Sequence, residues 1–283
     1  MSSDGEAMAA ADEQSAVVRP RRANVIASYD LSVERYEQLW SPVILKVATA
    51  LAARMNFAER GLVLDVGAGT GALAPMIRAA QPRATVFALD ASMAMLRLAH
   101  VNRQLPAIQA DAMVLPVAAS SVDAVIVAFV LFHLEDPLAA LKEAARVLRT
   151  GGEVGTATWA SERIERAEFV FADTLERAGV PALPAGRVDT GLDSPVAMER
   201  ILGKAGLVPR QVWMEWLCHQ WDAESFFALA TGRGGTQRRL ALLDAEARAS
   251  VLERLREEFA ALGPEDYLWE GESVCAVAVK ADS

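Results

Sequence analysis

The sequence predicts a doubly wound α/β fold, in which helices cover both faces of a mostly parallel sheet. Two observations predict it. Between residues 61 and 159, short apolar runs alternate with longer segments that have a helical period. Two of these runs, GLVLDV and VDAVIVAFV, are almost continuously apolar, which is typical of strands buried on both faces. Repeated strand–helix units build a parallel sheet whose ligands bind at the carboxyl ends of the strands.

The predicted elements of this core alternate along the chain. Glycine precedes the first apolar run, Pro82 ends the first helix, and Gly151 and Gly152 close the last one. We expect strands at 61–66, 84–90, 107–111, 122–130 and 152–159, with helices at 71–82, 91–102 and 137–151.

The segments on either side of this core are mainly helical in pattern. Residues 24–60 precede it, and Pro42 restarts a helix there. Ser194 before Pro195 is typical of a helix N-terminus, and glycines end the helix that begins near residue 222. After the core we expect helices at 161–180, 194–208, 222–235 and 243–263, with strands at 210–221 and 272–280.

Composition bounds the function. The chain has 283 residues, a net charge of −9 and a hydrophobic content of 53%, so a large core can form and an acidic surface disfavours nucleic acid. Its two cysteines, Cys218 and Cys275, indicate neither a disulfide framework nor a zinc site. We find no pattern of a signal peptide or membrane span, and expect a cytoplasmic monomer or homodimer. Residues 1–23 are predicted to be a flexible tail, and residues 24–283 a single domain.

A glycine-rich turn follows the first predicted strand. Gly67, Gly69 and Gly71 permit positive φ angles and let a ligand approach the backbone at a helix N-terminus. With Asp90 about twenty residues further on, GAGTGA also satisfies the dinucleotide-binding pattern. On this motif alone, an NAD(P)-dependent oxidoreductase remains an alternative.

Two further acids favour a ligand other than a dinucleotide. Asp65 lies just before the glycines, where a carboxylate would repel a pyrophosphate but attract an ammonium group. Asp111 ends the third predicted strand, where it could accept a hydrogen bond from an adenine amino group. Together with Asp90, these acids suit a ligand that has adenine, a ribose diol and a charged amino acid but no phosphate. S-adenosylmethionine (SAM) is such a ligand.

Five motifs resemble, in order and spacing, those of class I SAM-dependent methyltransferases: VLDVGAGTGAL, ALDASMAML, QADAMVLP, VDAVIVAFVLFHLEDP and EAARVLRTGGEV. The chain is most similar to the small-molecule group that includes the ubiquinone/menaquinone C-methyltransferases. The resemblance implies a Rossmann-like core at 59–160, cap helices at 24–58, and a C-terminal part at 161–283 that completes the sheet with an antiparallel last strand and caps the substrate. It also implies SAM as cofactor, S-adenosylhomocysteine as product and no metal.

The resemblance carries site residues with it. The backbone of the glycine turn would lie near the methionine moiety, Asp90 would bind both ribose hydroxyls, and Asp111 would hold the adenine edge. Tyr36 would reach the methionine end from the N-terminal segment. The implied cofactor-binding residues are Tyr36, Asp65, Gly67, Ala68, Gly69, Gly71, Asp90, Ala91, Met95, Asp111, Ala112, Ala128 and Phe129.

Methyl transfer is an in-line displacement that needs alignment and exclusion of water more than a dedicated catalytic group. His133, in FVLFHLEDP, is the acid–base candidate; the alternative is that it positions the cofactor or packs under the loop. Aromatic residues outside the core favour an apolar or aromatic acceptor and O- or C-methylation. A non-catalytic SAM-binding protein is a further alternative. The expected substrate pocket comprises Tyr29, Trp40, Trp159, His219 and Phe226.

Overall fold

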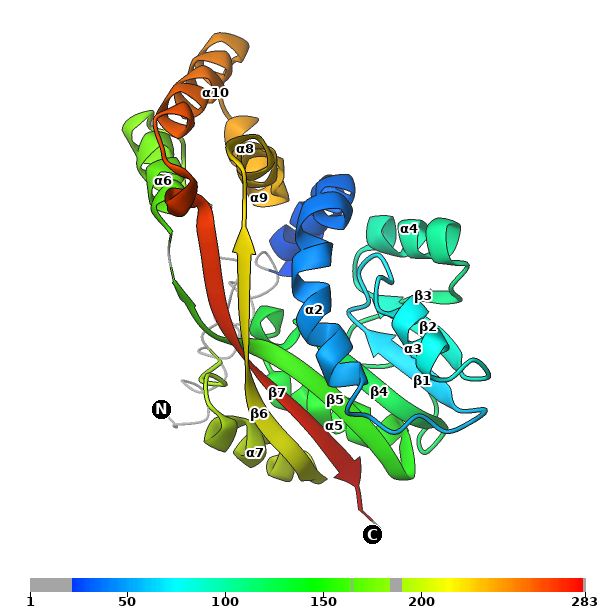
Figure 1. Ribbon diagram of the computed structural model, residues 1–283. Helices are drawn as coiled ribbons and strands as arrows, with labels where there is room; N and C mark the ends of the chain where they lie inside the picture. The colour runs from blue at the N-terminus through cyan, green and yellow to red at the C-terminus, as the bar shows by residue number, and fades with distance from the viewer. Residues whose placement is uncertain (1–21, 164, 184–189, 282–283) are drawn as a thin grey trace, which may run out of the picture.

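The computed structural model describes residues 22–163, 165–183 and 190–281, so the expected tail at 1–23 lies outside the description except for residues 22 and 23, which are helical. One seven-stranded sheet has the order β3-β2-β1-β4-β5-β7-β6 (Figure 1). The first five strands of that order run parallel, and β7 is antiparallel to both β5 and β6. The strands are β1 (Leu62–Val66), β2 (Thr85–Asp90), β3 (Ala107–Gln109), β4 (Val122–Ala128), β5 (Leu148–Arg163), β6 (Leu207–Gln220) and β7 (Leu268–Lys280).

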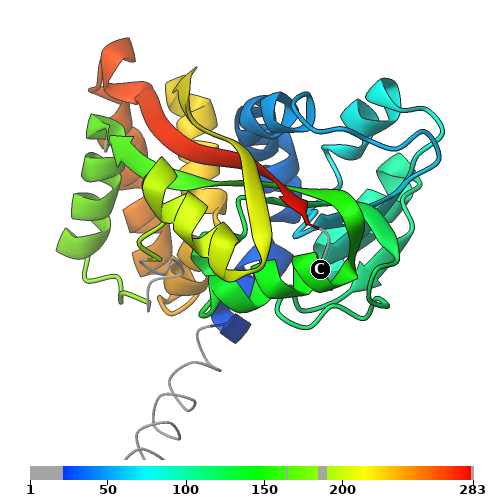
Figure 2. The same cartoon turned by 90° about the horizontal axis from the view of Figure 1, so that it is seen from below.

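The doubly wound prediction is therefore confirmed, together with the antiparallel closing strand. Alternate residues of each strand point to opposite faces, and the core divides accordingly into two apolar clusters. One cluster joins the sheet to α2 (Ser41–Ala52), α3 (Ala74–Ala80) and α4 (Met93–Arg103). The other lies under α5 (Pro137–Val147) and α7 (Pro195–Lys204), which cover the opposite face (Figure 2).

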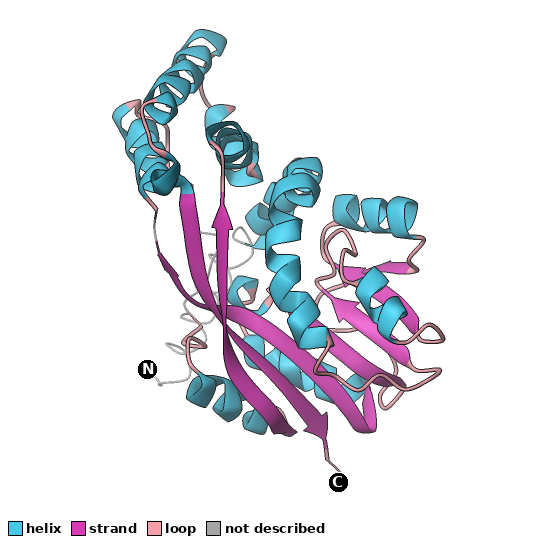
Figure 3. Ribbon diagram, in the orientation of Figure 1, coloured by secondary structure: helices cyan, strands magenta, loops and turns pink. Residues whose placement is uncertain are grey.

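Three long strands carry the chain beyond the parallel core. β5, β6 and β7 extend past the other strands and lead to a group of helices at one end of the molecule (Figure 3). These helices are α6 (Arg166–Arg177), α8 (Ala223–Gly232), α9 (Gly234–Leu240) and α10 (Ala245–Ala260). The expected cap is thus built on strand extensions.

Three local expectations were wrong. The helix predicted at 137–151 ends at Val147, because β5 begins at Leu148 and includes Gly151 and Gly152. The helix predicted at 161–180 begins only at Arg166, because residues up to Arg163 continue β5 and pair with β7. The helix predicted to end in glycines near residue 235 instead gives way to a second helix that begins at Gly234. A Cβ at Gly234 would lie 1.8 Å from the carbonyl oxygen of Ser28, so this glycine marks a helix–helix contact.

The N-terminal segment forms one helical rod. Residues 22–35 are α-helical, Tyr36–Trp40 form a π-helical turn, and α2 begins at Ser41 with Pro42 in its first turn, as expected. The Ser41 amide donates to the carbonyl of Tyr36 across this wider turn. Several residues of this segment line the cavity described in the next subsection.

Candidate active site

A cavity of about 810 Å³ opens where the parallel strands end. Its floor is the carboxyl edge of β1, β2 and β4, its cover is the N-terminal helical segment, and its far wall comes from β5, α6, α8 and α9. Most predicted site residues line it: Tyr29, Tyr36, Trp40, Gly67, Gly69, Asp90, Ala91, Met95, Asp111, Ala112, Ala128, Phe129, His133 and Trp159.

Five predicted residues lie elsewhere. Asp65 is buried within β1 and Ala68 packs against the core, both just behind the cavity wall. A Cβ at Gly71 would meet Leu105 at 2.4 Å, so this glycine serves packing rather than ligand approach.

The two remaining corrections concern the expected substrate pocket. Phe226 is fully buried against Phe259 and Tyr267, with ring centroids 5.3 and 5.6 Å away. His219 lies on β6, where its ring is 4.1 Å from that of Trp221. The position of His219 agrees with the strand predicted at 210–221 and with the alternative that it is a partly exposed strand histidine. The burial of Phe226 could not be predicted, because it depends on how the helices of the C-terminal part pack.

The glycine turn and Asp90 form one unit. The amides of Gly69 and Ser92 each donate to the Asp90 carboxylate at 2.8 Å. Burial raises the pKa of Asp90, and these donors partly oppose the rise. Burial and the nearby Asp90 charge raise the pKa of Asp65 to about 7. The site therefore concentrates negative charge that a bound cation would relieve.

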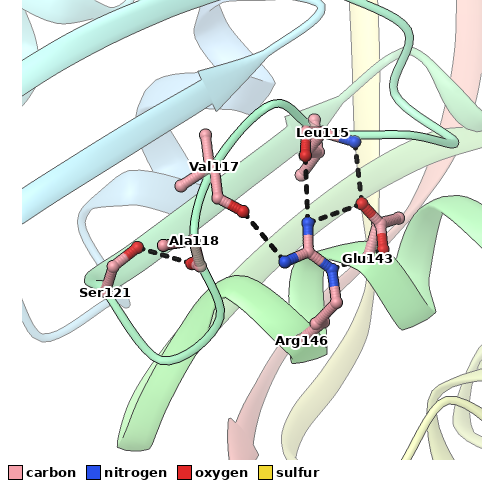
Figure 4. A network of polar contacts seen from close by, with 6 residues as sticks. All are labelled: Leu115, Val117, Ala118, Ser121, Glu143 and Arg146. Atoms are coloured by element: carbon pink, nitrogen blue, oxygen red, sulfur yellow. Dashed lines mark hydrogen bonds and ion pairs between the residues drawn. The ribbon is translucent and has the colours of Figure 1, made fainter.

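The loop after β3 is held by an ion pair at its base (Figure 4). Arg146 on α5 donates to the carbonyls of Leu115 and Val117 at 3.0 and 2.9 Å, and Glu143 accepts from the Leu115 amide at 2.7 Å. The hydrogen bond with Arg146 lowers the pKa of Glu143. This loop includes Asp111, which lines the cavity. The ion pair therefore helps to hold Asp111 in place, although neither of its residues lines the cavity. Sequence reasoning missed both residues, although EAARVLRTGG contains them.

Asp111 is restrained from two sides. The Met113 amide donates to its Oδ1 at 2.9 Å, and Arg22 from the N-terminal helix forms an ion pair with its Oδ2 at 2.6 Å.

Further contacts hold the N-terminal helical segment over the floor. Glu37 accepts hydrogen bonds from Thr70 and Arg103, and the Ser92 hydroxyl donates to Asp30 at 2.5 Å. The Tyr36 ring packs over Gly69, and burial raises its pKa well above the ordinary value.

Aromatic rings form the middle of the cavity. Phe129 directly follows β4 and has a φ of +59°, and its ring centroid lies 4.5 Å from that of Trp159. Trp269 packs edge-on against both Trp40 and Trp159, at 5.2 and 5.5 Å. Sequence reasoning missed Trp269; its only signal was a place shortly before the predicted closing strand.

Neither a metal site nor a membrane-spanning helix is found among the described residues. Within residues 22–163, 165–183 and 190–281 no group of three or more potential ligands could hold a metal ion. Over the same part of the chain, no helix is long and apolar enough to cross a membrane.

Part of the chain matches a known protein family. Residues 64–155 match the family model described as a methyltransferase domain. Over these residues the chain carries a methyltransferase domain. This domain contains the glycine turn and all the acids that meet at the strand ends.

Individual relatives agree with that assignment. The chain is 41% identical over 111 residues to the ubiquinone/menaquinone biosynthesis C-methyltransferase of Syntrophotalea carbinolica. This match covers 37% of this chain and 46% of that protein. The malonyl-[acyl-carrier protein] O-methyltransferase of Laribacter hongkongensis is 29% identical over 238 residues, 68% of this chain and 80% of that protein. The chain therefore spans about half the length of the quinone methyltransferase it matches.

Solved structures share the fold of the methyltransferase domain and its extensions. The protein solved in complex with the Haloferax volcanii Trm112 methyltransferase activator is 19% identical, with a TM-score of 0.57, over 91% of this chain and 98% of that one. None of these relatives supports the oxidoreductase alternative.

Proposed function

We propose that this protein transfers the methyl group of S-adenosylmethionine to a small apolar or aromatic acceptor, by O- or C-methylation. The observation that carries the proposal is a single cavity that joins two kinds of surface. Its floor holds the glycine turn with Asp90 and Asp111, and its middle holds Phe129 and Trp159. A nucleoside fits the first surface, and an aromatic body fits the second.

The charges of the floor fit a cationic, phosphate-free cofactor. The Asp90 charge raises the pKa of the buried Asp65 carboxyl, and desolvation raises the pKa of both groups. A diphosphate placed on the same turn would add negative charge to this pair, whereas an ammonium or sulfonium would offset it. Asp90 has oxygens suited to a ribose diol, although its present donors, Gly69 and Ser92, occupy part of its capacity.

The chain's own residues then have distinct tasks. When bound, SAM supplies a methyl group on a sulfonium that is already an activated leaving group. The tryptophans exclude water and hold the acceptor, and an aromatic face tolerates the passing positive charge. His133 would accept the acceptor's proton through its imidazole, which Tyr29 contacts. The continuation of the cavity past Phe129 favours an enzyme over a non-catalytic SAM-binding protein.

The proposal is tested by cofactor binding and by turnover. Asp90→Ala should abolish measurable S-adenosylhomocysteine binding, because a buried charged acceptor is lost, about 1.5–3 kcal/mol for each hydrogen bond. Asp173→Ala, on the outer surface of α6 and outside the cavity lining, is the matched control and should bind as the wild type does. Methyl transfer from labelled SAM to a panel of phenols and quinols then tests catalysis. Wild-type affinity in Asp90→Ala would contradict the proposal.

A further inference from the structure

A buried carboxylate lies at the far end of the cavity, away from the glycine turn. Glu165 lines the cavity and is only 8% exposed. It occupies the N-cap position of α6, yet its side chain does not cap that helix. Among the described residues, its carboxylate has no donor other than its own backbone amide. A buried carboxylate of this kind is costly unless a ligand supplies a partner.

The charges around Glu165 favour a cation as that partner. Among the described residues, the charges that shift the pKa of Glu165 are those of Glu168, Arg233 and Glu162. Arg233 is already engaged, since its Nη1 lies 2.9 and 3.1 Å from the two carboxylate oxygens of Glu168. Burial and the Glu168 charge raise the pKa of Glu165 to about 7, and a cation beside it would lower that pKa again.

Two further arginines of the cavity wall are held by neighbouring protein oxygens. Arg239 donates to the carbonyls of Val180 and Pro181, and Arg238 donates to Asn24, so both tie α9 to its neighbours. An anionic ligand would bind to these guanidiniums. Tightest binding of an anionic probe is therefore one outcome of the experiment described below.

The position of Glu165 sets where on the acceptor the cation lies. Trp159, whose ring lies beside that of Phe129, precedes Glu165 by six residues, so their Cα atoms are separated by at most about 22 Å. The tryptophans of the cavity lie at the Trp159 end of this span, and Phe171 on α6 also lines the cavity.

We propose that the acceptor is an aromatic amine, whose ring lies among the tryptophans and whose protonated amino group binds the Glu165 carboxylate. The inference deepens the proposed function by naming the acceptor class for the same cavity. The amine anchors the molecule at the end opposite the cofactor and is therefore distinct from the atom that is methylated. Glu165 is a specificity-determining residue in this arrangement.

The test compares three probes with the same aromatic body: phenylbutylamine, phenylbutanol and phenylbutyrate. Their affinities are measured by calorimetry at pH 7.5, with and without saturating S-adenosylhomocysteine. We expect the amine to bind about tenfold more tightly than the alcohol, and the carboxylate to bind most weakly. Glu165→Gln should remove the preference for the amine while leaving the alcohol's affinity within about twofold. Glu176→Gln, an exposed carboxylate on the same helix, is the control and should keep the preference.

Three results would overturn the inference. The first is equal affinity for the amine and the alcohol. The second is tightest binding of the carboxylate, which would assign the wall arginines to an anionic acceptor. The third is the absence of binding by all three probes. The wild-type comparison stands without the variant if Glu165→Gln does not fold. A failure of S-adenosylhomocysteine binding would instead contradict the proposed function, and the probe series without cofactor separates the two failures.

Discussion

The Tyr29 hydroxyl lies 2.8 Å from Nε2 of His133, and this contact joins the cover of the cavity to the loop after β4. Both rings line the cavity, and they meet edge-on with centroids 5.4 Å apart. The orientation of the imidazole therefore depends on a residue of the N-terminal helical segment. A group that takes a proton must be held in this way if its nitrogen is to face the acceptor.

The first prediction concerns these two side chains. His133→Ala should reduce kcat by about 10²-fold or more, because general-base catalysis is lost, while affinity for S-adenosylhomocysteine stays within about twofold. Tyr29→Phe should reduce kcat by a smaller factor, because the base remains but loses a restraint. Steady-state kinetics and calorimetry measure the two effects. Wild-type turnover in His133→Ala would show that the histidine only packs.

The second prediction concerns Asp65 and pH. Its pKa is raised from 3.8 to about 7 in the folded chain, so the folded state binds the proton more tightly than the unfolded state. The resulting stability is fully present below pH 4 and is lost as pH rises towards 7, by roughly 4 kcal/mol at most. Asp65→Asn should flatten this part of the stability profile, measured by urea unfolding at pH 4.5 and 7.5. An unchanged slope would contradict the account of a buried, protonated acid.

Ligand binding gives the same group a second signature. A cation bound beside Asp65 favours the ionised carboxylate, so S-adenosylmethionine binding at pH 6.5 should release protons. Calorimetry in buffers of different ionisation enthalpy measures the release, and Asp65→Asn should reduce it. Proton uptake on binding would contradict the proposed electrostatics.

The third prediction concerns the ion pair behind the site. Arg146→Ala should destabilise the protein by about 1–2 kcal/mol, because the carbonyls of Leu115 and Val117 lose their donor. It should also weaken S-adenosylhomocysteine binding, because the same loop carries Asp111. Arg254→Ala, an exposed arginine on α10, should do neither. Loss of stability with unchanged affinity would show that the loop keeps its position without the pair.

The fourth prediction compares two glycines with positive φ. At Gly67 a Cβ would lie 2.1 Å from Cγ2 of Val130, whereas at Gly151 nothing lies within 4 Å. Both alanine substitutions incur backbone strain of roughly 1 kcal/mol, but Gly67→Ala adds a clash at the edge of the cavity. The melting temperature of Gly67→Ala, measured by thermal unfolding, should therefore be well below that of Gly151→Ala. Equal effects would mean that Val130 moves aside freely.

The sequence predicted the core of this molecule well, because local signals specified it. Apolar runs gave the five parallel strands, and the acids after them had to meet at one edge of the sheet. The cap was harder. The continuation of β5 to Arg163 depends on pairing with β7 more than a hundred residues later, and a polar, helix-like stretch conceals it. Trp269 and Phe226 illustrate the result, since only the folded cap decides which of them lines the cavity.

The central claim is that the floor of the cavity binds an adenosine-bearing cation and not a diphosphate. The most direct measurement is calorimetric titration of the protein with S-adenosylmethionine, S-adenosylhomocysteine, NAD and NADP under identical conditions. We predict micromolar or tighter binding of the two sulfur nucleosides and no measurable binding of either dinucleotide. Binding of NAD or NADP, with no affinity for S-adenosylmethionine, would contradict the account.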